Sequence, residues 1–476
     1  MKKVNLSRRD FLRMSALAAA GTALASCAPK GTQVIEASTQ ATQPTEEVKS
    51  PTQAPPPEQE GTITFMGWGG VEEDQGVQAA IKVFQGENPK IKVTWMYTPD
   101  LYDEKMNTYI AAGTPPDTAF ISEGSYPTYA KDSLLMDITD KIAADPLIGK
   151  ADYFIEPLEK NRSLINGKWY GIGSCWTNFH IYYNADIFKD AGIEPPSYDP
   201  DKAWEWTHFK DVARQLTLDN NGKHPDESGF DLANVKQWGA WWANDWAGPF
   251  INIPMVNDGH FYDPDTGKFT LDQAADYEAL QNVADLMLVD HVMPQVAAFS
   301  GLGMSASQML ENRKLAMAID GSWALSWMWK IKATLGTAVL PKMAARGTFA
   351  RAHSHAAFKS TKQADASWEW VRFLATPFYE SQFCKIGRWL PNQTSLMTAE
   401  GLKTWMDPQV HPQGYEMIVK DYMNKDAKTF LYPLHWNEAY NDLIKPALDA
   451  VWNGDKKAKD VFTEVTPQAN AVIEKL

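Results

Sequence analysis

Three short β-rich runs separated by two helical patterns constrain the fold of this chain more than any other feature. In order along the sequence, they are strand 61–66, helix 72–87, strand 91–95, helix 101–112 and strand 117–121. Asn88-Pro89 ends the first helical pattern, and Gly113-Thr114-Pro115-Pro116 ends the second. This alternation predicts an α/β fold with a parallel, doubly wound sheet.

Two polar or aromatic segments follow strands of this predicted sheet. Trp68-Gly69-Gly70 follows the first strand, and Ser122-Glu123-Gly124-Ser125 follows the third. Sheets of this kind bind ligands at the carboxyl ends of their strands. We therefore expect Trp68, Glu123 and Ser125 to contact a ligand.

The first 27 residues have the features of an export signal rather than of a folded domain. Ser7-Arg8-Arg9-Asp10-Phe11-Leu12-Arg13 matches a twin-arginine motif, and a short apolar stretch follows it. Leu24-Ala25-Ser26-Cys27 has the pattern of a bacterial lipobox, in which the Cys27 thiol takes the lipid. The alternative is an ordinary signal peptide with a chance cysteine. Residues 28–60 are rich in Thr, Gln and Pro, which predicts a disordered linker.

The overall charge and the apolar content narrow the function classes. The chain has 476 residues and a formal net charge of −14, which argues against a nucleic-acid-binding protein with a basic face. After the signal segment, no apolar run approaches the roughly 20 residues that a membrane span needs. The chain has 19 Trp residues, and Trp is seldom fully buried, so we expect some of them to line a groove.

Six motifs, in order and at approximate spacing, carry a family resemblance. They are AAGTPPD (111–117), NGKWYGI (166–172), IYYNADIF (181–188), AGI (191–193), KLAMAIDGSW (314–323) and GRWLP (387–391). Over residues 61–450 the chain resembles the extracellular solute-binding proteins of ABC importers, in the sugar-binding group related to maltose-binding protein.

The resemblance implies a type II periplasmic-binding-protein fold, in which two doubly wound lobes are joined by a three-strand hinge. Lobe one would comprise residues 61–176 and 320–352, and lobe two residues 177–319 and 353–476. The chain would cross between lobes near residues 175–178, 316–319 and 353–356. The ligand would lie between the lobes, as in other proteins that close about a hinge.

A sugar ligand needs aromatic rings for its C–H face and planar polar groups for its hydroxyls. Tryptophans alternate with such groups in several segments of this chain. Adjacent residues of a strand point to opposite faces, so at most one of Trp241 and Trp242 should face a ligand. Together with the strand-end residues, the candidate ligand contacts are Trp68, Glu123, Ser125, Trp176, Asn178, Trp241, Trp242, Asp320, Trp323, Arg388, Trp389 and Trp436.

Other side-chain patterns are weaker. His353 and His355 could share a strand face, but the sequence places no third metal ligand near them, so we expect a structural pair and no metal. Cys175 and Cys384 could form a disulfide outside the cytoplasm.

We predict a substrate-binding lipoprotein that captures a sugar and delivers it to an ABC permease. The abundance of Trp favours an oligosaccharide, since each stacked ring needs its own platform. The protein would be a monomer without cofactor or nucleic-acid partner, anchored through Cys27 to the outer face of the cytoplasmic membrane. The alternative is a secreted carbohydrate-active enzyme in which Glu123 and Asp320 form a catalytic carboxylate pair.

Overall fold

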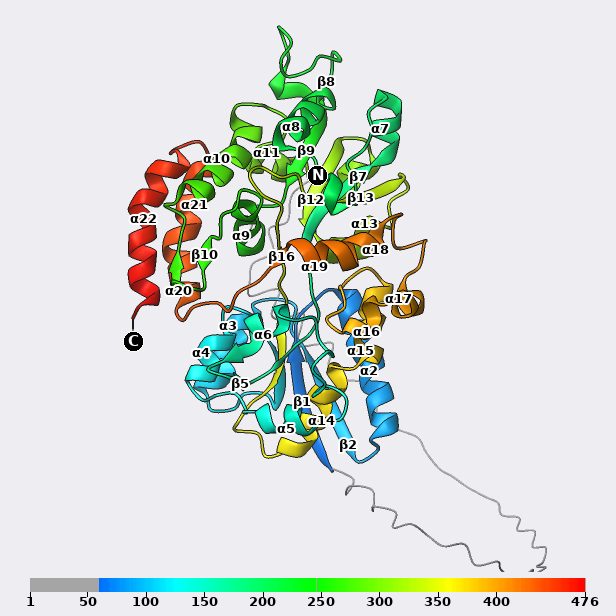
Figure 1. The fold of residues 1–476 in the computed structure, drawn as a ribbon, viewed down its shortest axis with the longest axis vertical. Coiled ribbons are helices and arrows are strands. Elements are labelled where there is room, and N and C mark those ends of the chain that lie inside the picture. Colours follow the sequence, from blue (N-terminus) through cyan, green and yellow to red (C-terminus); the bar gives the residue numbers. More distant parts are fainter. Residues whose placement is uncertain (1–59, 245, 476) are drawn as a thin grey trace, which may run out of the picture. The chain divides into compact units, whose positions relative to one another are not determined.

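Two five-stranded sheets organise the residues that the computed structural model describes, 60–244 and 246–475. The first sheet has the strand order β2-β1-β3-β15-β6, and the second has the order β13-β7-β12-β9-β8. In Figure 1 the first sheet lies in the lower part of the molecule and the second in the upper part. We call each sheet with its covering helices a lobe. The predicted signal peptide, and the linker up to residue 59, lie outside the described residues.

The first sheet is built from the predicted alternation of strands and helices. Its elements are β1 (Gly61–Gly67), α2 (Val71–Glu87), β2 (Ile91–Tyr97), α3 (Tyr102–Ala111) and β3 (Thr118–Ile121). Strand β1 pairs in parallel with both β2 and β3. Strand β15 (Ser354–Ala357) then adds antiparallel to β3, and β6 (Ile172–Gly173) pairs with β15. The predicted α/β class is confirmed, and the sheet is mixed because of these two later strands.

The second sheet is also mixed. It comprises β7 (Phe179–Asn184), β8 (Leu218–Asp219), β9 (Val235–Trp242), β12 (Leu315–Gly321) and β13 (Leu335–Ala338). Strand β12 runs antiparallel to β7 and parallel to β9. All six residues of β7, which lies between β13 and β12, are buried, so both faces of this inner strand are covered.

The remaining helices surround the two sheets. In chain order they are α4 (Tyr126–Lys131), α5 (Thr139–Ala144), α6 (Leu158–Ser163), α7 (Ala185–Ala191), α8 (Trp206–Gln215), α9 (Ala247–Met255), α10 (Ala274–Leu288), α11 (Val296–Gly301), α12 (Ala306–Glu311), α13 (Leu325–Met328), α14 (Ala364–Leu374), α15 (Pro377–Lys385), α16 (Thr394–Met397), α17 (Ala399–Trp405), α18 (Tyr415–Met417), α19 (Met423–Asp426), α20 (Trp436–Ala439), α21 (Lys445–Trp452) and α22 (Ala458–Ile473).

Short elements complete the fold. The strand pairs are β4 (Leu164–Ile165) with β5 (Lys168–Trp169), β10 (Tyr262–Asp263) with β11 (Lys268–Phe269), and β14 (Thr348–Phe349) with β16 (Ala427–Lys428). The 3₁₀ turns are η1 (Pro200–Lys202), η2 (Leu232–Asn234) and η3 (Ser322–Ala324), and the π-helical segments are η4 (Ile418–Tyr422) and η5 (Tyr440–Ile444).

Helix packing follows the position of apolar side chains. Helix α8 buries Trp206, Phe209, Val212 and Ala213, which share one face at helical spacing, and it packs on β9. Helix α14 packs on β1 and β15 of the first sheet, and α15 packs on α2. Helix α22 packs on α10 and α21 beside the second sheet (Figure 1). No described helix is long and apolar enough to span a bilayer.

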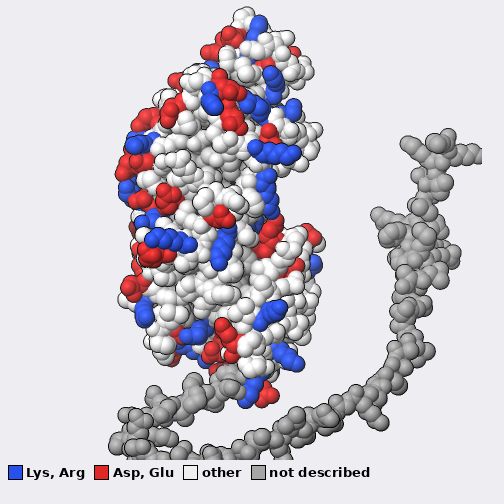
Figure 2. All heavy atoms as spheres, turned by 90° about the vertical axis from the view of Figure 1, so that its right-hand side faces the viewer, with Lys and Arg blue, Asp and Glu red and all other residues white. Residues whose placement is uncertain are grey.

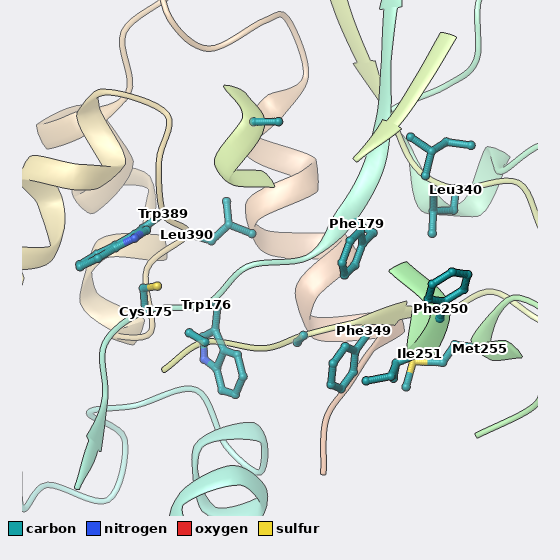
Figure 3. Close-up of a cluster of buried hydrophobic side chains, with 14 of the residues drawn as sticks. Cys175, Trp176, Phe179, Phe250, Ile251, Met255, Leu340, Phe349, Trp389 and Leu390 are labelled. Atoms are coloured by element: carbon teal, nitrogen blue, oxygen red, sulfur yellow. The ribbon is translucent and has the colours of Figure 1, made fainter. Parts of the chain in front are cut away.

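The segment at Trp176 and Thr177, which crosses between the lobes, pairs through its backbone with the loop at Leu390 and with a second crossing segment at Arg351. The Trp176 and Leu390 backbones exchange two N–H···O bonds of 2.8 and 2.9 Å, and Thr177 and Arg351 exchange two of 2.9 and 3.1 Å. In Figure 3 the buried side chains of Trp176, Leu390 and Phe349 lie along these segments. The chain passes from β6 of the first sheet to β7 of the second at residues 174–178, and a second crossing follows β14 at residues 350–353.

The expected crossing at residues 316–319 is wrong. These residues lie inside β12, which pairs with β7 and β9 in the second sheet. The strand pairings also differ from the expected lobe boundaries, since β13 lies in the second sheet and β15 in the first. The sequence of a strand shows its periodicity but not which strand it pairs with. The lobe boundaries depend on that pairing, so they could not be derived from local sequence. The third crossing follows α17, which packs on α15 of the first lobe, and leads to α18 and η4.

Trp436 lies in the core of the protein rather than on its surface. The Trp436 ring is 3% exposed and packs against Phe269, Tyr432 and Tyr440, with centroid distances of 5.3, 4.4 and 5.9 Å. This aromatic cluster anchors α20 against the elements around it.

Replacing Trp436 with alanine should therefore destabilise the fold. We expect the Trp436→Ala substitution to lower the free energy of unfolding in urea by about 3–5 kcal/mol, because it leaves a large cavity. Trp327 is 37% exposed, so Trp327→Ala should cost about 1 kcal/mol or less. Equal losses in the two variants would contradict this placement of Trp436.

The pH dependence of stability should reveal the buried His355. Its ring contacts Phe65 and Phe120 on the first sheet and Tyr379 on α15, and burial lowers its pKa from the ordinary 6.5 to about 3. The folded protein therefore keeps His355 neutral, whereas the unfolded chain binds a proton below pH 6.5. Its contribution is fully present above pH 6.5 and is lost as the pH falls towards 3.

We expect the free energy of unfolding of the wild type to fall by about 2 kcal/mol more than that of His355→Phe between pH 7 and pH 5. Urea denaturation of both proteins at the two pH values measures the difference. Parallel pH profiles would show that His355 is protonated equally in the folded and unfolded states.

Candidate functional site

A pocket of about 350 Å³ lies where both lobes and the crossing segments meet. Its walls come from strand ends and loops that are distant in sequence. The lining residues are Trp68, Glu73, Ser122, Glu123, Cys175, Thr177, Trp246, Trp323, Arg351, Ala352, His353, Arg388 and Trp389.

Four tryptophans from different elements form the aromatic walls. Trp68 follows β1 and lies edge-on to Tyr102 and Phe120, with centroid distances of 4.6 and 5.3 Å. Trp323 follows β12 and lies 5.5 Å from Trp246, which precedes α9. Trp389 follows α15, where it stacks on Phe383 at 4.0 Å. The pocket thus has aromatic surface from both lobes.

The turn that carries Trp68 depends on a glycine. Gly69 has a φ of +132°, and a Cβ at this position would lie 2.2 Å from an oxygen of Glu73. The backbone N–H of Gly70 donates to the same Glu73 carboxylate at 3.0 Å, which caps the start of α2. This close approach fixes Glu73 beside Trp68.

Two glutamate–arginine ion pairs supply the polar part of the pocket. Arg351 donates to Glu123 at 2.6 Å, and its guanidinium lies 4.6 Å from the centre of the Trp246 ring. Arg388 donates to Glu73 at 2.5 Å. Burial by itself disfavours a charged guanidinium, but the nearby Glu123 carboxylate outweighs it and raises the pKa of Arg351.

Three buried polar atoms in the pocket wall have no hydrogen-bond partner among the described residues. They are Oε1 of Glu123, Nε of Arg351 and Nε2 of His353. Burial lowers the pKa of His353 well below its ordinary value, with help from His355 and nearby arginines, so the imidazole is neutral. A buried polar group without a partner costs free energy, so a ligand hydroxyl that bonded to these atoms would gain stability.

The structure brings five of the predicted contacts to this pocket: Trp68, Glu123, Trp323, Arg388 and Trp389. Ser125 lies one turn away and accepts a hydrogen bond from Ser122 at 3.0 Å. Asp320 accepts from the backbone N–H of Gly321 at 2.7 Å and does not line the pocket.

The other five predicted contacts lie in the core. Trp176 packs under the Arg162 guanidinium at 3.7 Å, and the Asn178 amide oxygen pairs with His180 at 3.0 Å. Trp241 stacks on Phe299 at 3.8 Å, whereas Trp242 is fully buried. Trp436 belongs to the aromatic cluster described above. Of these five residues, none lines the pocket.

Sequence reasoning missed eight lining residues. They are Glu73, Ser122, Cys175, Thr177, Trp246, Arg351, Ala352 and His353. Trp246 stood at the end of a Trp-rich run, and Cys175 and Thr177 flanked a predicted crossing, so position could have indicated these three. Arg351 and His353 have no distinctive local pattern, since only the pairing of crossing segments brings them to the pocket.

No described group of three or more His, Cys, Asp or Glu residues could hold a metal ion. His353 and His355 lie 5.3 Å apart between ring centres and pack against aromatic rings. Cys175 and Cys384 are buried free thiols in the structure.

A second pocket, of about 300 Å³, lies around Pro157, Asp263 and Phe430 and has no tryptophan in its lining.

Comparisons with known proteins agree with this architecture. In the curated proteins, a putative binding protein of Brucella abortus is 23% identical over 409 residues, covering 83% of this chain and 89% of its own length. The arabinooligosaccharide-binding protein of Bacillus subtilis is 27% identical over 234 residues, about 48% of each chain.

Solved structures of similar fold include two with high coverage. An ABC substrate-binding protein from Listeria monocytogenes, in complex with cycloalternan, superposes with a TM-score of 0.73 at 20% identity, covering 87% of this chain and 98% of its own. The sugar-binding protein MalE of Xanthomonas citri superposes with a TM-score of 0.70 at 18% identity, covering 87% and 97%. At these identities the likeness shows the fold alone.

The bacterial extracellular solute-binding protein model matches residues 68–379, which include Trp68, the second sheet and the crossing at Arg351. The predicted family resemblance is confirmed, and so is the prediction that the protein is not an enzyme. The chain belongs to the bacterial extracellular solute-binding protein family.

Proposed function

We propose that this protein captures a sugar in the tryptophan-lined pocket and delivers it to an ABC permease. The observation that carries the proposal is a single pocket in which four tryptophans from both lobes alternate with two glutamate–arginine pairs. That the sugar is an oligosaccharide stays a prediction.

The chemistry of the pocket suits a polyhydroxylated ring. Trp68, Trp246 and Trp323 offer flat apolar surfaces for the C–H face of a sugar. Glu123 Oε1 can accept from a hydroxyl group, and Arg351 Nε can donate to one. A ligand held in this way would satisfy buried polar groups and bury apolar surface together.

Contacts with both lobes would couple binding to closure. Trp68 and Glu123 belong to the first lobe, whereas Trp246 and Trp323 belong to the second. A ligand that bridges them has more contacts when the lobes are closed, so it shifts the equilibrium towards the closed state by that difference in affinity. The closed form would then be the one that docks on the permease.

The names of related proteins support a carbohydrate as cargo. One curated relative is an arabinooligosaccharide-binding protein, and similar folds have been solved with cycloalternan and with maltose. The site agrees with a non-catalytic family, because Glu123 Oε2 is held by Arg351 and Asp320 lies outside the pocket lining.

The charged surface fits a receptor that works in solvent beside a membrane. Figure 2 shows acidic and basic side chains interspersed over one face, with no large area of a single charge. We also propose that the predicted twin-arginine signal exports the protein and that lipidated Cys27 anchors it to the outer face of the cytoplasmic membrane, with residues 28–60 as the linker.

Loss of a pocket tryptophan should weaken sugar binding without unfolding the protein. We expect Trp323→Ala and Trp68→Ala to lower affinity about ten- to a hundredfold, because each removes a stacking surface worth about 1.5–3 kcal/mol. Titration calorimetry with a sugar found by a thermal-shift screen measures the effect.

Trp204→Ala is the matched control for these variants. Trp204 lies edge-on to His208 at 4.8 Å and does not line the pocket, so its loss should leave affinity unchanged. Wild-type affinity in both pocket variants would refute this placement of the site, and hydrolysis of the sugar would favour the enzyme instead.

The lipid anchor has a separate test. Cys27→Ser should move the full-length protein from the membrane fraction to the soluble fraction after export, because the acylated thiol is lost. Incorporation of labelled fatty acid into the wild type and not into the variant measures the modification. A variant that stayed in the membrane fraction would argue for an anchor other than lipidated Cys27, and a wild type found in the soluble fraction would argue for an ordinary signal peptide.

A further inference from the structure

Among the described residues that line the tryptophan pocket, every charged side chain is paired with an opposite charge in the same pocket. Glu123 pairs with Arg351, and Glu73 pairs with Arg388, at N···O distances of 2.6 and 2.5 Å. These side chains are between 4% and 23% exposed, so both pairs are largely removed from water.

The two other titratable groups in the lining are neutral. Burial lowers the pKa of His353 and raises that of the Cys175 thiol, so neither carries charge near neutral pH. The described side chains that line the pocket therefore sum to zero charge, since they comprise two carboxylates and two guanidiniums.

We infer that this pocket selects uncharged sugars and rejects their uronic acid, phosphorylated and amino counterparts. The inference rests on the proposed function and adds the charge class of its ligand. The two glutamates act as internal counterions, which mask the arginines from anionic ligands.

The physical reason is the cost of a buried charge that has no counterion. An anionic ligand would approach Arg351 or Arg388 only beside Glu123 or Glu73, whose negative charge opposes it. A cationic ligand would meet the same conflict with the guanidiniums. A hydroxyl group carries no such penalty and can bond to Glu123 Oε1, Arg351 Nε or His353 Nε2 without breaking either ion pair.

The inference predicts that removing a counterion reverses the selectivity. Glu73→Gln leaves Arg388 with an uncompensated positive charge at the pocket wall, while the amide oxygen can still cap Gly70. Glu123→Gln does the same for Arg351 and provides a second variant if the first fails to fold. The control is Glu205→Gln, which breaks a surface pair with Lys342 outside the pocket.

The experiment compares ligands of matched shape. Neutral mono- and disaccharides, their uronic acids, their phosphates and their amino sugars are titrated by calorimetry into wild type and variants, after circular dichroism confirms folding. We expect the wild type to bind a neutral sugar at least a hundredfold more tightly than its charged counterparts. In Glu73→Gln or Glu123→Gln, affinity for the uronic acid should rise at least tenfold, and in Glu205→Gln it should not change.

The outcomes separate the two proposals. A wild type that binds a uronic acid, phosphate or amino sugar as tightly as the neutral sugar would overturn the charge selectivity and leave the sugar receptor intact. Folded variants without any gain for the uronic acid would show that the glutamates do not mask the arginines. If no sugar of any charge binds the wild type, the proposed function fails, and the inference that rests on it fails too.

Discussion

The position of Arg351 at the crossing between lobes is the constraint on which the site depends. Its backbone pairs with Thr177 on another crossing segment, and its side chain bonds to Glu123 and stacks on Trp246. Arg351 thus links its own crossing segment to the one at Thr177. It also contacts the end of β3 in the first lobe, through Glu123, and a loop of the second lobe, through Trp246. A buried guanidinium is tolerable there only because Glu123 neutralises it. Leaving either charge alone would cost about 3–5 kcal/mol.

The local half of this arrangement could be predicted from the sequence. Strand periodicity and stop signals placed β1, α2, β2, α3 and β3 correctly, because these elements are contiguous and each is specified by its own residues. The carboxyl edge of a parallel sheet follows from that order, so Trp68 and Glu123 could be named as pocket residues. The family resemblance extended this to Trp323, Arg388 and Trp389.

The other half depends on pairings between distant segments. Arg351 and His353 reach the pocket because the segment after β14 crosses between the lobes and pairs with Thr177. No local sequence pattern predicts this pairing. The Trp-rich segments gave wrong predictions for a related reason. Four tryptophans stand within three residues of a polar side chain in sequence, yet pack into the core: Trp176, Trp241, Trp242 and Trp436. The burial of a side chain depends on which residues it contacts across the fold. A nearby Asn or Asp in the sequence therefore did not distinguish a tryptophan that lines the pocket from one that packs in the core.

The placement of the ion pairs also bears on how the lobes can move. Glu73 and Arg388 both belong to the first lobe, since α15 packs on α2, and Arg351 lies on a crossing segment next to Glu123. Opening the lobes therefore need not break either buried pair. Among the described ion pairs, Lys330 with Glu72 does span the lobes, but these side chains are 46% and 42% exposed, and such a pair contributes only about 0–1 kcal/mol. Strong charge pairs kept within a lobe or its hinge therefore add no ion-pair cost to lobe opening, as the proposed closure about a sugar requires.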